Sequence, residues 1–312
     1  MSEPTPNWER EVLEKLALSA IQEQRRSRHW SILFKTLGFL YLFIVLFLVA
    51  GWFGSDGVSI KEHTALVDLQ GVIASDQASA DSVIASLQGA FEDKKTKGVI
   101  LRINSPGGSP VQAGQIYDEI RRLRALHPKI PLYAVVDDIC ASGGYYVAVG
   151  ADKIFVDKAS IVGSIGVLMD GFGFTQTMQK LGVERRLLTA GENKGFLDPF
   201  SPVDPKQAAF AKQMLEEIHG QFIGVVREGR GKRLQETPEM FSGLVWSGEK
   251  SIQLGLADAL GNVESVARDV IKAEDIVDYT QREGLAARLA SRLGASAAKA
   301  LMPFEQAGVR LR

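Results

Sequence analysis

Hydrophobic positions divide the chain into one long apolar run near the N-terminus and a larger part in which short apolar runs alternate with amphipathic stretches. Residues 36–53 read TLGFLYLFIVLFLVAGWF and contain no charged side chain. At helical rise they span roughly 27 Å, close to the thickness of the hydrocarbon core of a bilayer. Trp30 and Trp52 lie at the two ends of this region, as aromatic residues do at membrane interfaces. The pattern predicts an uncleaved transmembrane anchor over residues 30–54, with a buried core helix or a cleaved signal peptide as alternatives.

Positive charge is distributed unevenly around this run. After it, Lys61 is the only nearby cation, whereas four cations precede it: Arg25, Arg26, Arg28 and Lys35. Lys and Arg are enriched on the cytoplasmic side of membrane helices. We therefore expect a single-pass protein with residues 1–29 in the cytoplasm and the larger part of the chain outside it.

Beyond a linker over residues 55–62, strand patterns alternate with helix patterns. Short apolar runs predict strands over residues 65–69, 98–103, 131–136, 153–156 and 165–168. Amphipathic or small-residue spacing predicts helices over residues 80–93, 112–125, 145–149 and 205–227. Asp204 as a cap and Pro205 in the first turn mark the start of the last of these helices. The alternation predicts an α/β domain over residues 63–275.

The C-terminal segment, residues 276–312, is predicted to form a strand and helix tail. Its leucines Leu285, Leu289 and Leu293 are spaced four apart, as on one side of a helix. Such a helix could pack on its own domain, on a neighbouring subunit or on the membrane surface.

Composition and charge exclude several functional classes. The chain of 312 residues has 36 Lys and Arg against 37 Asp and Glu, so no basic excess points to a nucleic-acid partner. The single cysteine, Cys140, excludes an internal disulfide and a cysteine-based metal cluster. The glycine-rich stretches complete neither a dinucleotide fingerprint nor a phosphate loop. The four histidines form no metal-binding pair: His29, His63, His127 and His219. We therefore expect no metal and no cofactor.

Two glycine-rich turns, Ser105–Gly108 and Ala141–Gly144, each follow a predicted strand. Ser142 in the second turn would lie exposed near the N-terminus of a helix, where backbone N–H groups can hold an oxyanion. Glycines beside it would let a substrate backbone approach. Both turns could equally be ordinary tight turns, because glycine-rich loops are common.

A serine hydroxyl becomes a nucleophile only when a base removes its proton. No histidine stands in a suitable place, but a lysine can serve if burial lowers its pKa from about 10.4 toward roughly 7–8. Lys194 precedes the largely apolar stretch 196–200, which could supply that burial. The residue pattern alone leaves open that Lys194 is a solvated loop lysine.

Taken together, an ordered set of motifs resembles the bacterial signal peptide peptidase A family over residues 63–275. The motifs are INSPGGSP (103–110), ASGGYYVA (141–148), GSIGV (163–167), ENKGFLDPF (192–200), GLVWSG (243–248) and GLADALG (255–261). The resemblance implies a core similar to the crotonase and Clp protease folds. It implies Ser142 as nucleophile, Lys194 as general base and Ser164 as the residue that orients the lysine, with an oxyanion hole made by the N–H groups of Gly108 and Gly143.

The Clp proteolytic subunit, which carries a similar oxyanion turn, uses a histidine some 25 residues after its serine. Residues 163–171 contain no histidine here, which favours the Ser/Lys dyad. The sequence departs from the family at Asp137-Asp138, where relatives often have a Met-Gly-containing run. These paired carboxylates could cap the turn or tune substrate entry.

The resemblance implies a membrane-anchored serine endopeptidase that works through an acyl-enzyme. Its substrates would be apolar peptides such as cleaved signal peptides, and its location the periplasmic, extracytoplasmic side of the bacterial inner membrane. A homo-oligomer is also implied, in which Ser142 and Lys194 could meet across a subunit boundary. The alternatives are a catalytically silent crotonase-fold scaffold in a membrane complex and an acyl-CoA enzyme of crotonase type, against which export from the cytoplasm argues.

Overall fold

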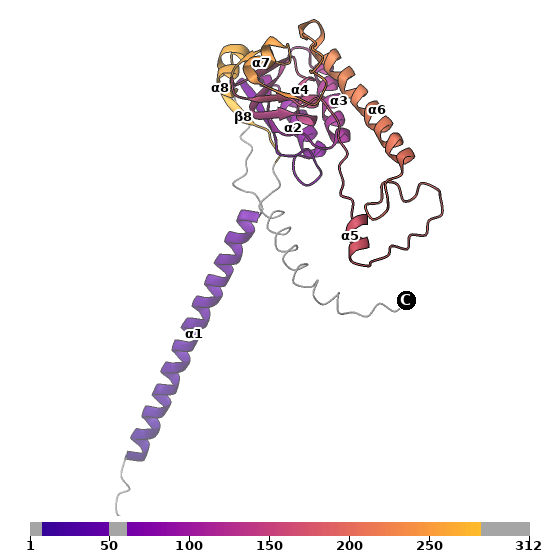
Figure 1. The fold of residues 1–312 in the computed structure, drawn as a ribbon. Coiled ribbons are helices and arrows are strands. Elements are labelled where there is room, and N and C mark those ends of the chain that lie inside the picture. The colour runs from indigo at the N-terminus through magenta and orange to yellow at the C-terminus, as the bar shows by residue number, and fades with distance from the viewer. Residues whose placement is uncertain (1–7, 50–60, 282–312) are drawn as a thin grey trace, which may run out of the picture. The chain divides into compact units, whose positions relative to one another are not determined.

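A computed structural model describes residues 8–49 and 61–281, which belong to two separate units (Figure 1). The first unit contributes α1 (Trp8–Val49), a continuous helix of 42 residues. Within α1, the stretch Glu23–Phe47 is the one candidate among the described residues that is long and apolar enough to cross a membrane. Residues 50–60, which include the end of the predicted anchor, and residues 282–312, which include most of the predicted tail, lie outside the described residues.

The second unit is built on one sheet of eight strands in the order β6-β5-β3-β2-β1-β8, with β4 beside β3 and β7 beside β4. Every strand pair is parallel except β5–β6. The strands are β1 (His63–Gln70), β2 (Thr96–Ser105), β3 (Leu132–Ala141), β4 (Lys153–Val156), β5 (Ile161–Gly163), β6 (Val245–Ser247), β7 (Ala259–Leu260) and β8 (Ile276–Asp278).

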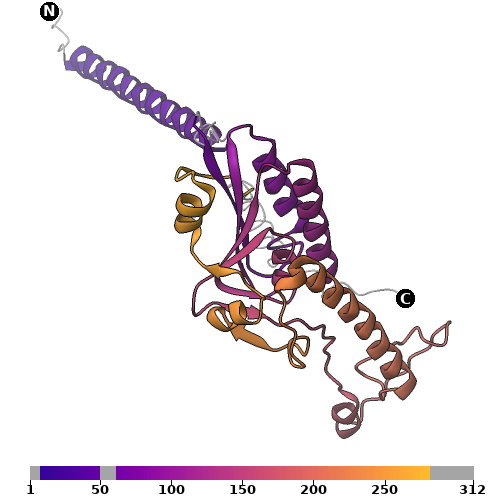
Figure 2. The same ribbon diagram turned by 90° about the horizontal axis from the view of Figure 1, so that it is seen from above.

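Helices cover both faces of this sheet, as Figure 2 shows for α2 and α3 on one side and α8 on the other. The helical elements are α2 (Ala80–Glu92), α3 (Pro110–Leu126), α4 (Gly143–Ala148), α5 (Thr175–Lys180), α6 (Pro205–Arg230), η1 (Gly231–Arg233), α7 (Gly248–Gln253), α8 (Val263–Ser265) and η2 (Val266–Ile271). Alternate strand residues enter different cores: Val67 packs with α2 and α3, whereas Leu66 packs with α8 and η2. The predicted α/β fold is confirmed, because helices pack on both faces of a largely parallel sheet.

One strand prediction was wrong, and another strand extends further than predicted. Residues 165–168 form no strand; the strand at this place is β5, which ends at Gly163. The antiparallel ladder stops there because its partner β6 begins at Val245, and Ser164 is held instead by a bond from its N–H to the carbonyl of Leu244 (2.7 Å). The strand predicted to end at residue 136 continues as β3 to Ala141.

The extension of β3 contains a bulge that accommodates Asp137 and Asp138. Ile103 of β2 pairs with Val136, but Ser105 pairs with Cys140, so β3 carries two extra residues between these positions. Before the bulge β3 pairs with β4, and after it with β5. The bulge therefore changes the partner strand at the end of β3, and Ser142 is the residue directly after that end.

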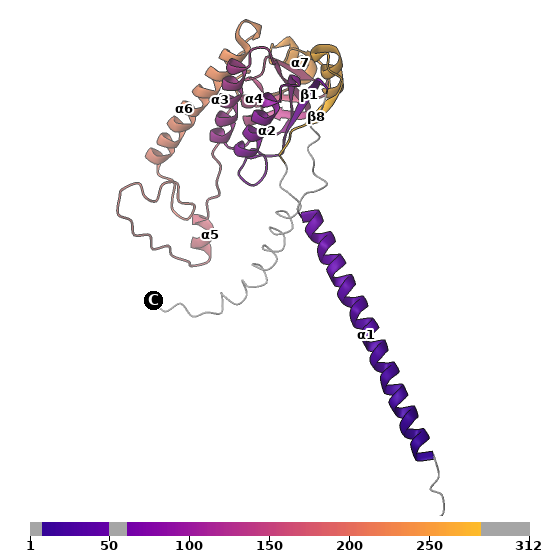
Figure 3. The ribbon, with the colours of Figure 1, turned by 180° about the vertical axis from the view of Figure 1, so that it is seen from behind.

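The first and last strands of this unit are neighbours in the sheet. β8 pairs in parallel with the outer edge of β1, and the two lie side by side in Figure 3. The hydroxyl of Thr64 donates to the carbonyl of Ala273 (2.7 Å), and the N–H of Asp68 donates to the hydroxyl of Thr280 (3.0 Å). Residues more than 200 positions apart thus close one side of the sheet.

The GLADALG motif contributes to a buried ion-pair network. Asp258 accepts from Arg230 (2.8 Å) and Arg233 (3.1 Å), and the Arg230 side chain is only 1% exposed. Arg230 Nε also donates to the carbonyl of Gly255 (2.7 Å). Gly255 has φ +72°, and a Cβ there would lie 1.8 Å from the carbonyl oxygen of Arg233. This motif therefore has a structural role in joining the end of α6 to the sheet.

Candidate active site

Ser142 lies at the sharp turn between β3 and α4. Its φ of 51° and ψ of −122° are unusual for a residue with a side chain. The turn is held on both sides, because the N–H of Ser142 donates to the carbonyl of Gly163 (2.9 Å) and its own carbonyl accepts from the N–H of Tyr146 (3.0 Å). The strained turn leaves the hydroxyl half-buried in a pocket.

The Ser105–Gly108 turn packs directly against the Ser142 turn. A Cβ on Gly107 would lie 2.7 Å from the Cβ of Ser142, so only glycine permits this approach. The fully buried Ile73 clamps the turn, donating its N–H to the carbonyl of Gly107 (2.8 Å) and accepting from the N–H of Ser109 (2.8 Å). The two glycine-rich turns, which the sequence places after different strands, thus lie against each other.

The two turns bring the N–H groups of Gly108 and Gly143 together. A Cβ on Gly143 would lie 3.3 Å from the nitrogen of Gly108, and both residues line the pocket that contains Ser142. Neither N–H group has an acceptor within the described part of the chain, and the first N–H groups of a helix such as α4 have none by geometry. Two free donors beside a serine hydroxyl are the arrangement that an oxyanion needs.

Gly108→Ala is expected to destabilise the protein by about 1–3 kcal/mol, because Gly108 has φ +149° and a Cβ there would lie 2.2 Å from the carbonyl oxygen of Ile73. Urea unfolding followed by circular dichroism measures the change. Gly114→Ala in α3 is the matched control: its Cβ would meet nothing within 4 Å, so stability should be unchanged or rise slightly. Equal stabilities of the two variants would contradict the clamp by Ile73.

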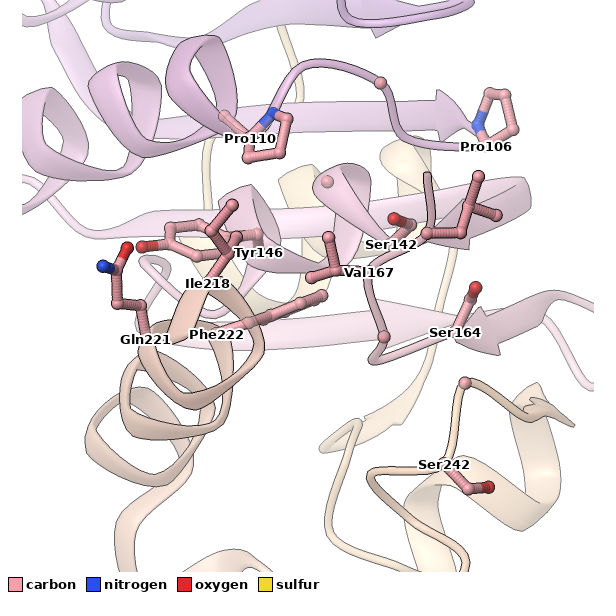
Figure 4. A pocket seen from close by; sticks show the side chains of 16 residues that line it. Pro106, Pro110, Ser142, Tyr146, Ser164, Val167, Ile218, Gln221, Phe222 and Ser242 are labelled. Atoms are coloured by element: carbon pink, nitrogen blue, oxygen red, sulfur yellow. The ribbon is translucent and has the colours of Figure 1, made fainter. Parts of the chain in front are cut away.

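The pocket has a volume of about 600 Å³, within the range of small-molecule and peptide-side-chain sites. Figure 4 shows that α4, the loop after β5 and α6 supply its walls, with Ser142 and Ser164 on neighbouring wall segments. Ser164 also has a positive φ, 53°. None of the described residues that line the pocket carries a charge, and the apolar ones include Ala113, Val167, Ile218 and Phe222.

Two ionisable groups near Ser142 stay neutral. Burial, reinforced by the charge of Asp118, raises the pKa of the Tyr146 phenol, which lines the pocket. Complete burial raises the pKa of the Cys140 thiol far above its usual range. Since the thiolate is the reactive form, Cys140 is a packing residue and not a competing nucleophile.

Lys194 does not line this pocket. It lies on an arm, residues 167–204, that carries α5 and extends away from the sheet in Figure 1. No residue of the arm is buried, and Lys194 itself is exposed. The arm is attached to α6 by contacts such as Phe196 against Phe210 and the N–H of Leu197 to the side chain of Gln207 (3.1 Å). The structure therefore brings together Ser142, Ser164, Gly108 and Gly143, and leaves Lys194 apart from them within one chain.

Sequence reasoning missed the contribution of α6. Ile218, Gln221 and Phe222 line the pocket, and Ile218 and Phe222 are four apart on one side of the helix. That spacing could have indicated a buried helix face, but not which cavity it meets. Asp137 and Asp138 line a separate hollow, where Asp138 accepts from the side chain of Asn104 (3.1 Å). They neither cap the Ser142 turn nor border its pocket.

Comparison with known proteins gives family matches over residues 62–277, which are nearly all of the sheet unit. The model of peptidase family S49 matches residues 124–277, and the Clp protease model matches residues 62–161. A protein of Brucella melitensis named "Na(+)/H(+) antiporter NhaA" is 46% identical over 190 residues, which are 61% of this chain and 26% of that protein. The chain thus matches about a quarter of the length of this relative.

Two further relatives match over most of their lengths. "Putative protease slr0021" of Synechocystis is 32% identical over 66% of this chain and 72% of its own length. "Putative signal peptide peptidase SppA" of Enterococcus faecium is 29% identical over 72% of this chain and 67% of its own length. With its Clp-protease-like fold and its ordered motifs, the chain belongs to peptidase family S49, the signal peptide peptidase A family of serine peptidases.

Proposed function

We propose that this chain is a membrane-anchored serine endopeptidase whose nucleophile is Ser142. The observation that carries the proposal is the position of Ser142 on a strained turn, in an uncharged pocket that Gly108 and Gly143 also line with N–H groups that have no acceptor among the described residues. An acyl-CoA enzyme needs no serine nucleophile at this place, and a silent scaffold needs no free donors beside it. Residues 63–275 would form the peptidase domain together with β8, which closes its sheet, and the anchor over residues 30–54 would precede it.

The proposed reaction proceeds through an acyl-enzyme. Neutral Lys194 takes the proton of the Ser142 hydroxyl, and the serine oxygen attacks the peptide carbonyl carbon. The N–H groups of Gly108 and Gly143 donate to the oxyanion that forms. Lys194 then returns the proton to the leaving amine. In the second half, water attacks the acyl carbonyl carbon while Lys194 takes a proton from it, and that proton passes to the Ser142 oxygen as the carboxylic acid product leaves. Ser164 would donate or accept a hydrogen bond that orients the lysine.

The lysine in this proposal comes from a second copy of the chain. A lysine serves as a base only after losing its proton, which burial favours, whereas Lys194 is exposed on its own arm. The arm also exposes large apolar side chains, among them Leu168 (80%), Phe172 (80%) and Leu188 (96%). Exposed apolar patches of this kind commonly mark protein interfaces. When a neighbouring copy covers the arm, Lys194 on that arm would become buried and would at the same time lie beside Ser142 of the neighbour.

The proposed substrates are apolar peptides, such as signal peptides left in the membrane after cleavage. The uncharged pocket suits apolar side chains, because a charged one would lose its hydration without a partner. The candidate membrane helix in α1 would hold the site close to such peptides. The cations before the apolar run orient the domain to the periplasmic side under the positive-inside rule.

The test is covalent labelling of the full-length protein in detergent with a serine-directed acylating probe, followed by mass spectrometry. We expect one labelled serine, Ser142, and hydrolysis of an apolar peptide by the same preparation. Ser201→Ala, a serine on the arm, should label like the wild type. A protein that hydrolyses no peptide and acquires no label at Ser142 would be a scaffold, and turnover of a CoA thioester would favour the acyl-CoA alternative.

A further inference from the structure

The wall of the pocket after β5 belongs to no strand, yet it carries Ser164 with its positive φ. Three contacts hold it in place. The carbonyl of Gly163 accepts from the N–H of Ser142 (2.9 Å), and the N–H of Ser164 donates to the carbonyl of Leu244 (2.7 Å). The carbonyl of Ile165 meets the side chain of His219 at 3.2 Å from Nε2. An uncommon backbone conformation persists only where surrounding contacts determine it, so these three hydrogen bonds, together with the fully buried side chain of Ile165, fix Ser164.

His219 supplies the one contact of the three that is made by a side chain. It lies half-buried on α6, beside Ile218, which lines the pocket. A carbonyl oxygen can only accept, so Nε2 of His219 carries the proton in this contact. The bond joins α6, which forms one wall of the pocket, to the loop that forms the next wall.

We propose that His219 is a positioning residue: it holds the Ser164 wall, and thereby the hydroxyl of Ser164, in the geometry that the site requires. This inference rests on the proposed peptidase function. A displacement of about 1 Å at a catalytic group can cost roughly 100-fold in rate, so a contact outside the pocket can control turnover. The rival role, a general base at Ser142, does not fit the geometry, because His219 is not among the residues that line the pocket and its Nε2 donates to the Ile165 carbonyl.

The experiment compares full-length wild type with His219→Ala and His219→Gln. Glutamine can donate a hydrogen bond from its amide but cannot take up a proton in catalysis. Glu217→Ala is the control, since this exposed residue lies two positions away on the same helix and bonds only to Gln213 within the described residues (3.3 Å). Two readouts are needed: amide hydrogen exchange of residues 163–168, and kcat and KM for an apolar peptide.

For His219→Ala we expect about fivefold to tenfold faster exchange in residues 163–168, because one hydrogen bond that holds the wall is lost. The kcat should fall by about 10- to 100-fold, with a smaller change in KM. His219→Gln should restore most of both values, and Glu217→Ala should match the wild type. The Tm of His219→Ala should fall by only about 2–4 °C, as for the loss of a single hydrogen bond in a domain of this size.

Unchanged exchange in His219→Ala would overturn the proposal, and so would faster exchange with unchanged kcat. Restored exchange in His219→Gln without restored kcat would also overturn it, in favour of a proton-transfer role for the imidazole. A wild-type protein without peptidase activity would instead refute the proposed function. The exchange comparison would then still decide whether His219 holds the wall.

Discussion

Ser142→Ala is expected to lower the rate of peptide hydrolysis by about 10⁴- to 10⁶-fold, to a remainder provided by binding and by the free N–H groups. Lys194→Ala should cost a similar factor, because a nucleophile and its base act as one unit and removing either disables both. Lys194→Arg should be equally inactive, since a guanidinium keeps the charge but does not give up its proton. Initial rates on an apolar peptide, measured with full-length protein in detergent, check these values.

The Ser142→Ala and Lys194→Ala variants, each inactive alone, should restore activity when they are produced together. If Ser142 of one copy is served by Lys194 of the next, random mixing places an intact pair at about one quarter of the sites of a ring. Activity near a quarter of the wild-type value is therefore expected from a 1:1 mixture of Ser142→Ala and Lys194→Ala chains. The pair would be formed from two chains, neither of which is active alone.

Lys180→Ala is the matched control, because Lys180 ends α5 on the same arm as Lys194. It should retain wild-type turnover and should not alter complementation. No recovered activity in the mixture, with both single variants inactive, would mean that the arm folds back on its own chain. Wild-type turnover of either Ser142→Ala or Lys194→Ala would refute the dyad itself.

Asp258→Ala is expected to destabilise the sheet unit by about 3–5 kcal/mol, because it leaves the almost fully buried Arg230 without its carboxylate. That loss is a large part of the total stability of an ordinary domain. Thermal unfolding should show a Tm lower by about 6–20 °C. Asp269→Ala is the control: its pair with Arg268 is more than half exposed on both sides, and its loss should cost less than about 1 kcal/mol.

The same network predicts a dependence of stability on pH. Burial by itself would raise the pKa of Asp258, but the hydrogen bond and charge of Arg230, with smaller contributions from Ile154 and Arg233, lower it below the usual aspartate value. A lowered pKa contributes stability above about pH 4, and this contribution is lost as the pH falls through the lowered value. Wild type should therefore lose stability in acid more steeply than Asp258→Ala. Parallel curves for the two proteins would contradict the ion pair.

The sequence predicted the parts of this fold that local pattern controls. The strands expected from the apolar runs of β1 and β2, and the Asp204 cap with Pro205 at the start of α6, appear where they were expected. The segment 165–168 has the apolar pattern of a strand, but a strand also needs a neighbour, and β6 ends its pairing at Gly163. Whether a run finds a partner depends on distant residues and cannot be read from the run itself.

The candidate site was predictable to a similar extent. The glycines of both turns could be placed together because each follows a strand of one parallel sheet, whose carboxyl ends lie at one edge. The contributions of Ile218 and Phe222 depend on how α6 crosses α4, where Gly229 approaches Val149 so closely that a Cβ would lie 2.3 Å from the Val149 carbonyl oxygen. The position of Lys194 could not be predicted, because the arm that carries it has no buried residue to fix its path.

The pairing of β1 with β8 has a consequence for the order in which the newly made protein acquires its structure. β1 leaves the ribosome about 200 residues before β8, and until then its outer edge exposes unpaired N–H and C=O groups. Helices α2 and α3 can cover one face of the growing sheet early, but the edge stays open until residues 276–280 have been synthesised. Translation that stops before these residues yields a chain in which the outer edge of β1 is unpaired and can pair with other chains. Such a chain is a target for chaperones and proteases.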